Sequence, residues 1–297
     1  DEFEISNTVR QTIGANESDT EEFAGYFSQF YYVDGQQLTP TSFGEFNSNN
    51  IWRPKEYSGG ATTTPAVSQV SSDSDTVNRT TYTFSSQALG AAAADRRIVV
   101  CAGGQGGGGT TLPSAITVGG VSATFVVESG ADSETLCAIW WAEVPTGTTG
   151  DVVVTFPTTK GNCGIVCYRL TGADIVLSTA SQTAVGSGAA STGTVGSTGN
   201  SVVIGQLYLL GTANRTTTWS GLTEDTDAVI EPFASQSTAS AVIAPDLVEV
   251  TATPSGATAQ EVFTLASFGS SVYGINGFFL DFADSADFGK DVSTTIT

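Results

Sequence analysis

Histidine and methionine are both absent from this chain of 297 residues. Without histidine, the chain lacks the commonest general base and the commonest transition-metal ligand. This absence excludes Ser-His-Asp catalysis and histidine-bound zinc within the chain. Without methionine, the chain lacks an initiator residue, and we therefore expect it to be a segment of a longer or processed polypeptide.

Positive charge is scarce. Lysine and arginine together number 10 and aspartate and glutamate 30, so the formal net charge is 10 − 30 = −20. Nucleic acid is not an expected partner, because phosphate contacts need clustered lysine and arginine. The same charge disfavours anionic membrane surfaces. Membrane insertion is not expected either, because no apolar run is long enough to cross a bilayer as a helix.

Cysteine is also rare, and Cys101, Cys137, Cys163 and Cys167 are the only four. Their spacing matches neither a zinc site nor a CxxC redox motif. We expect them to be small buried thiols. One disulfide is the alternative that the spacing leaves open.

The middle of the chain is rich in glycine, threonine, serine, alanine and valine, and only 13% of all residues are charged. Short apolar or alternating runs recur between small-residue turns, which is typical of an antiparallel β-sandwich of the jelly-roll or immunoglobulin-like kind. The predicted strands are 80–85, 97–102, 115–118, 123–128, 135–144, 151–156, 164–171, 201–210, 215–219, 237–243, 248–254 and 261–268.

We favour one large sandwich over residues 61–268, and two smaller ones, at 79–177 and 201–268, are the alternative. Residues 47–76 predict an irregular linker, and 181–200 predict a long loop or weak edge strands. The glycine run at 103–109 lacks the Gly-Lys-Ser/Thr ending of a phosphate loop. It is expected to be a flexible turn at the tip of the sandwich.

The two ends of the chain carry a different pattern. Alternation in 23–33 predicts a strand, and a turn signal follows it. The sequence then reads YYVDGQQLTPTSFGE at 31–45, WRPKEYSG at 52–59 and YGINGFFLDF at 273–282. Together these segments resemble a pattern of virion appendage proteins from tailed, especially marine, bacteriophages: tail fibres, tailspikes and capsid-attached fibres. In those proteins the pattern follows the last strands of a concanavalin- or laminin-G-like lectin sandwich.

The resemblance implies three regions. Residues 1–60 would hold the closing strands of a lectin-like sandwich and a connector, 61–268 an inserted β-sandwich domain, and 269–297 the connector to a further module. In the phage proteins the two later segments of the pattern are nearly contiguous, whereas here the middle region separates them. The resemblance also implies a homotrimer on the surface of the virion, in contact with other virion proteins and with host cell-surface glycans.

Aspartate residues near the C-terminus are the candidate metal ligands. Asp281, Asp284, Asp287 and Asp291 offer enough oxygen atoms for Ca²⁺, although their spacing is not that of an EF-hand loop. A solvated acidic loop is the competing interpretation. No other cofactor is expected.

The same carboxylates also raise the question of catalysis. A glycosidase needs two carboxyl groups held across a sugar cleft. The candidate carboxylates are Asp281 with Asp284, and the cluster Glu224, Asp225 and Asp227. Both groups lie in loop-like sequence without an aromatic cleft pattern, so we expect no enzyme activity.

Aromatic side chains are the candidate ligand contacts. Trp140, Tyr208 and Trp219 could stack on sugar rings if they were exposed, and core packing is the competing role. The sequence as a whole therefore predicts a structural phage protein, a fibre or spike segment for display and saccharide recognition. The alternatives are a polysaccharide-degrading tailspike enzyme and a bacterial surface adhesin.

Overall fold

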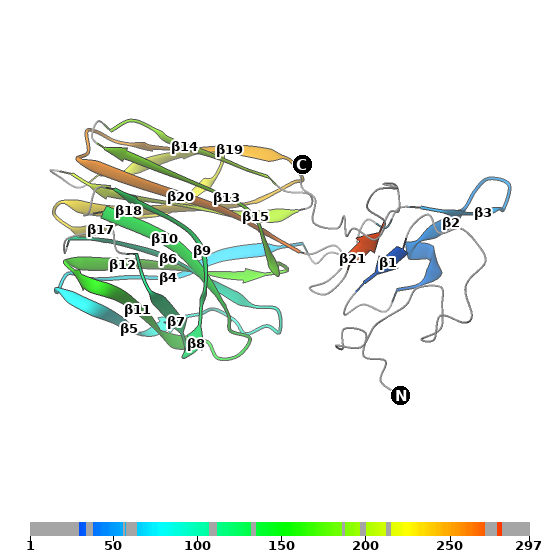
Figure 1. Cartoon of the computed structure of the whole chain (residues 1–297), viewed down its shortest axis with the longest axis horizontal. Coiled ribbons are helices and arrows are strands. Elements are labelled where there is room, and N and C mark those ends of the chain that lie inside the picture. Colours follow the sequence, from blue (N-terminus) through cyan, green and yellow to red (C-terminus); the bar gives the residue numbers. More distant parts are fainter. Residues whose placement is uncertain are drawn as a thin grey trace, which may run out of the picture. The chain divides into compact units, whose positions relative to one another are not determined.

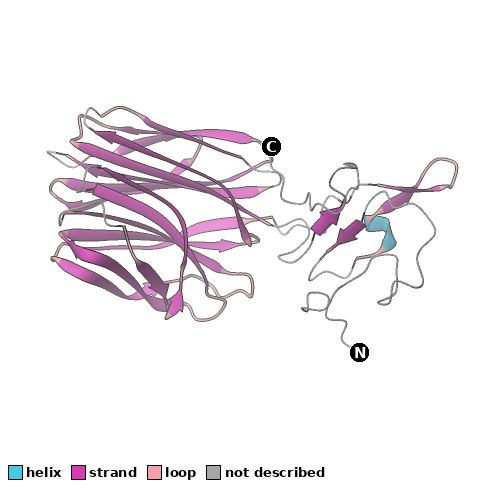
Figure 2. Cartoon of the chain, viewed as in Figure 1, coloured by secondary structure: helices cyan, strands magenta, loops and turns pink. Residues whose placement is uncertain are grey.

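The computed structural model consists almost entirely of β-strands (Figure 2). The chain divides into two compact units: unit 1 comprises Asp1–Ala61 with Ser271–Thr297, and unit 2 comprises Thr62–Ser270. The prediction of an all-β fold with antiparallel sandwich sheets is confirmed. The structure describes residues 30–33, 38–55, 57, 64–106, 112–131, 135–185, 188–196, 200–211, 215–270 and 278–280.

Unit 2 begins with a sandwich of two antiparallel sheets, called sandwich A below. Its inner sheet has the strand order β4-β12-β6-β10-β9, and its outer sheet has the order β5-β11-β7-β8. The strands are β4 Ala66–Asp75, β5 Arg79–Ala88, β6 Arg97–Gln105, β7 Ala115–Val118, β8 Val121–Ser122, β9 Thr124–Ala131, β10 Thr135–Glu143, β11 Thr149–Lys160 and β12 Asn162–Thr171.

A second sandwich, sandwich B, follows directly. Its inner sheet has the order β13-β20-β15-β18-β17, and its outer sheet has the order β14-β19-β16. The strands are β13 Ile175–Val185, β14 Ser191–Gly196, β15 Ser201–Leu210, β16 Thr217–Ser220, β17 Thr223–Glu231, β18 Ala234–Ile243, β19 Leu247–Pro254 and β20 Gln260–Gly269.

The two inner sheets pack face to face, so that unit 2 has four layers, from β14 and β19 at the top of Figure 1 to β5 and β11 at the bottom. Val100 of β6 packs in one cluster with Val152 of the outer sheet, whereas its neighbour Val99 packs with Ile204 of sandwich B. Strands buried on both faces carry continuous apolar runs instead of alternation. The favoured single sandwich would have two sheets, whereas the described strands of unit 2 form four.

Four strands lie where the sequence predicted a linker, loops or weak edges. β4 falls within the predicted linker, β13 and β14 overlap the small-residue segment at 181–200, and β17 contains the acidic cluster near residue 225. Each of the four is the edge strand of its sheet. An edge strand keeps solvent on one side, so it needs fewer apolar residues, and charged side chains there discourage pairing between molecules.

The start of the glycine run at 103–109 does not form the predicted turn. Gly103 and Gly104 lie inside β6 and are buried, so they belong to the inner sheet of sandwich A and not to a turn. The strand ends at Gln105, and Gly106 has a φ of 84°, which favours glycine. Residues 107–111 lie outside the described part of the chain.

All four cysteines are unpaired and buried, as expected from their spacing. Burial raises the pKa of Cys137 and that of Cys167 to about 12, because a thiolate is poorly solvated there. The thiolate is the reactive form of cysteine. We therefore expect a thiol reagent at pH 8 to label none of the four in the native chain and all four in denaturant. Rapid labelling of the native chain would contradict the burial.

Unit 1 joins the two ends of the chain. β1 (Phe30–Tyr32) pairs antiparallel with β21 (Phe278–Leu280), so residues far apart in the sequence are neighbours. A 3₁₀ turn, η1 (Pro40–Ser42), leads into a hairpin of β2 (Gly44–Phe46) and β3 (Trp52–Pro54). Tyr57 is buried against Tyr31 and Phe43, whose ring centroids lie 6.1 and 5.2 Å from its own.

Candidate functional site

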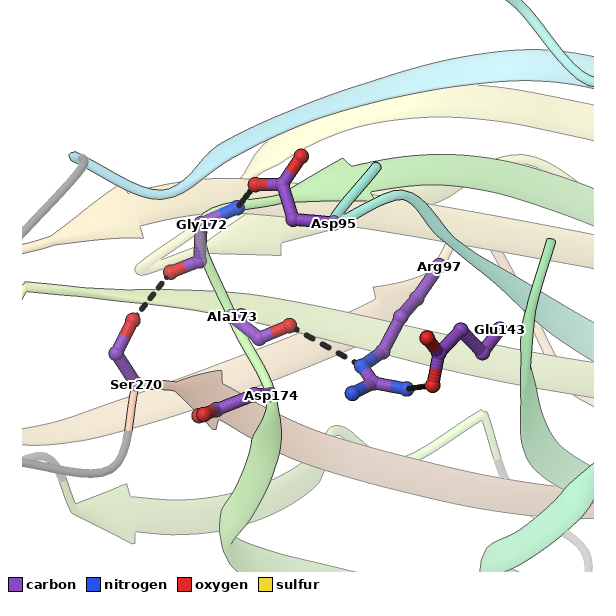
Figure 3. Close-up of a pocket in the computed structure, with 7 residues that line it drawn as sticks. All are labelled: Asp95, Arg97, Glu143, Gly172, Ala173, Asp174 and Ser270. Atoms are coloured by element: carbon purple, nitrogen blue, oxygen red, sulfur yellow. Dashed lines mark hydrogen bonds and ion pairs between the residues drawn. The ribbon is translucent and has the colours of Figure 1, made fainter. Parts of the chain in front are cut away.

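A pocket of about 170 Å³ opens where the chain passes from sandwich A to sandwich B (Figure 3). Arg97 begins β6 and Glu143 ends β10, and the two are directly paired across the sheet. The link between β12 and β13 forms another wall, and the residue after β20 closes the site. The lining residues are Asp95, Arg97, Glu143, Gly172, Ala173, Asp174 and Ser270.

Arg97 is the central group of this pocket. Its Nη1 lies 3.1 Å from Oε2 of Glu143, and its Nε donates to the carbonyl oxygen of Ala173 at 3.3 Å. Figure 3 shows the side chain extending between these two partners. The guanidinium also lies over the ring of Trp141, 4.7 Å from its centroid, which adds a cation–π contact. Arg97 is therefore fixed in position before any ligand arrives.

The link between the sandwiches is equally well fixed. Oδ2 of Asp95 accepts a hydrogen bond from the Gly172 N–H at 2.8 Å, and the Ser270 hydroxyl donates to the Gly172 carbonyl at 2.6 Å. Gly172 has a φ of 70°, a conformation that glycine adopts without strain. Residues from both sandwiches thus hold the link in one conformation.

The charges of the pocket decide what it can bind. One guanidinium and three carboxylates, those of Asp95, Glu143 and Asp174, give a formal charge of 1 − 3 = −2. Hydrogen-bond acceptors therefore outnumber donors, which suits a ligand with several hydroxyl donors. Glu143 is 60% exposed, so one side of its carboxylate is available to a ligand. An anionic ligand would be repelled.

The predicted sugar-stacking rings do not line this pocket. Tyr208 is completely buried, and its hydroxyl donates to Oδ1 of Asn162 at 2.7 Å. Trp219 is 9% exposed, and its Nε1 donates to the Ser237 hydroxyl at 2.8 Å. Trp140 is partly buried against the core of sandwich A. Tyr208 and Trp219 therefore pack in cores, and Trp140 packs against one.

The cluster Glu224, Asp225 and Asp227 lies on β17. Asp225 accepts a hydrogen bond from the Tyr168 hydroxyl at 2.9 Å, and Asp227 accepts one from the Thr217 N–H at 3.0 Å. Desolvation raises the pKa of both Glu224 and Asp225. Asp225 is thus bonded to β12 of sandwich A and Asp227 to β16 of sandwich B, and none of the three carboxylates lines the pocket.

The calcium candidates Asp281, Asp284, Asp287 and Asp291 lie outside the described residues. Within the described part of the chain, no group of three or more histidine, cysteine, aspartate or glutamate side chains is arranged to hold a metal ion. In the same part, no helix has the length and apolarity needed to span a membrane.

Neither the pocket nor the exposure of Trp52 was predicted from the sequence. Arg97 carried a usable signal, because it is one of only 10 basic residues and lies at the start of a strongly apolar strand.

Comparison with known proteins adds no family: no protein-family description matches the chain, and searches of curated proteins and of solved structures find no match.

Proposed function

We propose that this chain is a structural protein of a bacteriophage virion, a fibre or spike segment that displays a saccharide-binding unit to the host surface. The pattern at 31–45, 52–59 and 273–282 supports the phage assignment. The absence of histidine and the strong acidity fit a display protein better than a nucleic-acid-binding protein or an enzyme with a histidine base. Identical chains would assemble as a homotrimer alongside other virion proteins.

The pocket around Arg97 is the observation that carries the saccharide assignment. It is small and preformed, with a guanidinium donor beside carboxylate acceptors. Sugar hydroxyls both donate and accept, so they match such a mixture, and a fixed site loses little entropy on binding. The four packed sheets provide the rigid support that this arrangement needs.

Replacing Glu143 tests this site. Glu143→Gln is expected to weaken binding of the host surface polysaccharide at least ~10-fold, because a hydrogen bond to a charged group contributes about 1.5–3 kcal/mol. Glu249→Gln, which removes an exposed carboxylate on β19, is the matched control and should bind like the wild type. Surface plasmon resonance with the immobilised polysaccharide measures both variants.

Three outcomes would overturn parts of the proposal. An unaltered affinity for Glu143→Gln would remove the pocket from recognition. Absence of the chain's peptides from purified phage particles would refute the virion assignment and favour a surface adhesin. Shortening of the polysaccharide by the wild-type chain would show a degrading tailspike enzyme instead.

A further inference from the structure

Trp141 of β10 lies beside the pocket without lining it. It is paired with Val99 of β6, and the next pair on the same face of the sheet is Glu143 with Arg97. Arg97 and Trp141 are therefore diagonal neighbours, a spacing that long and aromatic side chains can bridge. The contact is made, because the Arg97 guanidinium lies 4.7 Å from the centroid of the indole ring.

The indole ring of Trp141 is also held from sandwich B. Its centroid lies 5.4 Å from that of the Phe268 ring, and the two ring planes are tilted by 40°. Phe268 is completely buried on β20, where it is paired with Val176 and Val202. It belongs to the apolar cluster between the two inner sheets, and Trp141 packs against that cluster. The ring thus connects the guanidinium of the pocket to the inner sheet of sandwich B.

The polar partners of Arg97 would not order its side chain by themselves. Glu143 is 60% exposed, and ion pairs with an exposed partner are weak. The hydrogen bond to the Ala173 carbonyl is longer than usual, at 3.3 Å. The Arg97 side chain is nevertheless only 15% exposed, and a cation over an aromatic ring is held more strongly where water is excluded. The indole therefore fixes the buried side of the guanidinium.

We propose that Trp141 is a positioning residue of the pocket: its ring, supported by Phe268 of sandwich B, sets the orientation in which Arg97 meets a ligand. A side chain that is already ordered loses little entropy on binding, so this contact raises the affinity without touching the ligand. The inference rests on the proposed function for what the pocket binds. The position of Arg97 itself can be measured without any ligand.

NMR spectroscopy of the full chain reads the position of Arg97 in the absence of a ligand. Protons held over an aromatic ring are shielded, so the Arg97 side-chain signals, identified by their loss in Arg97→Lys, are expected upfield of the ordinary arginine range. Trp141→Leu should return them to that range. Trp140→Leu is the matched control, because Trp140 is the adjacent residue on the opposite face of β10, packed against the core of sandwich A and 5.5 Å from the Phe125 ring. It should leave the Arg97 signals in place.

Surface plasmon resonance with the immobilised host polysaccharide measures the effect on recognition. Trp141→Leu is expected to weaken binding at least ~5-fold, through loss of a cation–π contact that is largely shielded from water. Trp140→Leu and Trp141→Phe should both bind within ~2-fold of the wild type, the second because phenylalanine keeps an aromatic face under the guanidinium. Leucine and phenylalanine are both smaller than tryptophan, so recovery by phenylalanine separates the role of the ring face from that of filled space.

The possible failures are distinguishable. A wild-type chain that does not bind the polysaccharide would overturn the proposed function and this inference together. A wild type that binds, with Trp141→Leu binding equally well, would overturn the inference alone. A weakened Trp141→Leu variant whose Arg97 signals have not moved, or which is weakened no more than Trp140→Leu, would show a general effect on the fold and would refute the positioning role as well.

Discussion

Replacing Arg96 by methionine is expected to destabilise the chain by about 3–5 kcal/mol, because each buried acceptor that loses its hydrogen-bond donor costs about 1–3 kcal/mol. The Arg96 side chain is completely buried, and each of its five N–H donors has a partner. Those partners are all backbone carbonyl oxygens, from the turns after β5 and between β10 and β11: Leu89, Gly90, Val144, Thr146 and Gly147.

The effect is large because methionine has about the volume of the arginine side chain but no hydrogen-bond donor. The Leu89 and Val144 residues are themselves buried, so their carbonyl groups would lose a partner where water is scarce. Lysine should restore less than half of the lost stability. Its ammonium group is a point donor and cannot reach two separate turns as a planar guanidinium does. Desolvation lowers the pKa of Arg96, but arginine stays charged in proteins.

Urea unfolding followed by tryptophan fluorescence measures this change, and Arg79→Met is the matched control. The Arg79 guanidinium lies 2.9 Å from the Asp75 carboxylate at the surface, with about half of its side chain exposed. Exposed ion pairs contribute roughly 0–1 kcal/mol, so the control should unfold almost like the wild type. A loss of only about 0–1 kcal/mol in the free energy of unfolding of Arg96→Met would show that the carbonyl contacts contribute little.

The sequence predicted the strands better than their layering. Alternation located β5 and β11, where Tyr82 and Val152 point inward and their neighbours face solvent. β6 and β15 gave continuous apolar runs, which identify a strand buried on both faces but not the sheet that covers it. Two of the strands that the prediction missed, β4 and β17, are polar edges whose position is set by pairing with β12 and β18.

The pocket could not be predicted from the sequence. Asp95, Arg97, Glu143 and Asp174 are ordinary surface residue types, and only the pairing of β6 with β10 and the link between the sandwiches bring them together. The aromatic candidates failed to line it for a related reason. Large rings such as Tyr208 gain more from burial than from exposure, and sequence alone does not show which ring remains outside.

A substitution at Gly103 tests how the two sandwiches fit together. Gly103 of β6 and Gly164 of β12 are direct neighbours in the inner sheet of sandwich A. A Cβ atom on Gly103 would lie 2.3 Å from the Tyr208 ring, and one on Gly164 would lie 2.6 Å from Cδ1 of Ile230. The two glycines thus leave a depression that receives side chains from the inner sheet of sandwich B.

Gly103→Val should therefore destabilise the chain by about 3 kcal/mol, near the upper end of the cost of overpacking a core. The tyrosine cannot easily move aside, because its hydroxyl is hydrogen-bonded to Asn162 of the facing sheet. Gly196→Ala is the control. Its Cβ would meet only the exposed side chain of Leu247, at 3.1 Å, and that side chain is free to shift. Urea unfolding compares the two variants.

A double-mutant cycle identifies the cause of the loss. If the Tyr208 ring is what valine strikes, then Gly103→Val should cost at least about 1 kcal/mol less in a Tyr208→Leu background than in the wild type, since residues in contact couple by 0.5–3 kcal/mol. Additive effects would mean that the strain lies within β6. Coupling would mean that the sandwiches fit through this contact, and the pocket around Arg97, built from both of them, would then depend on it for its shape.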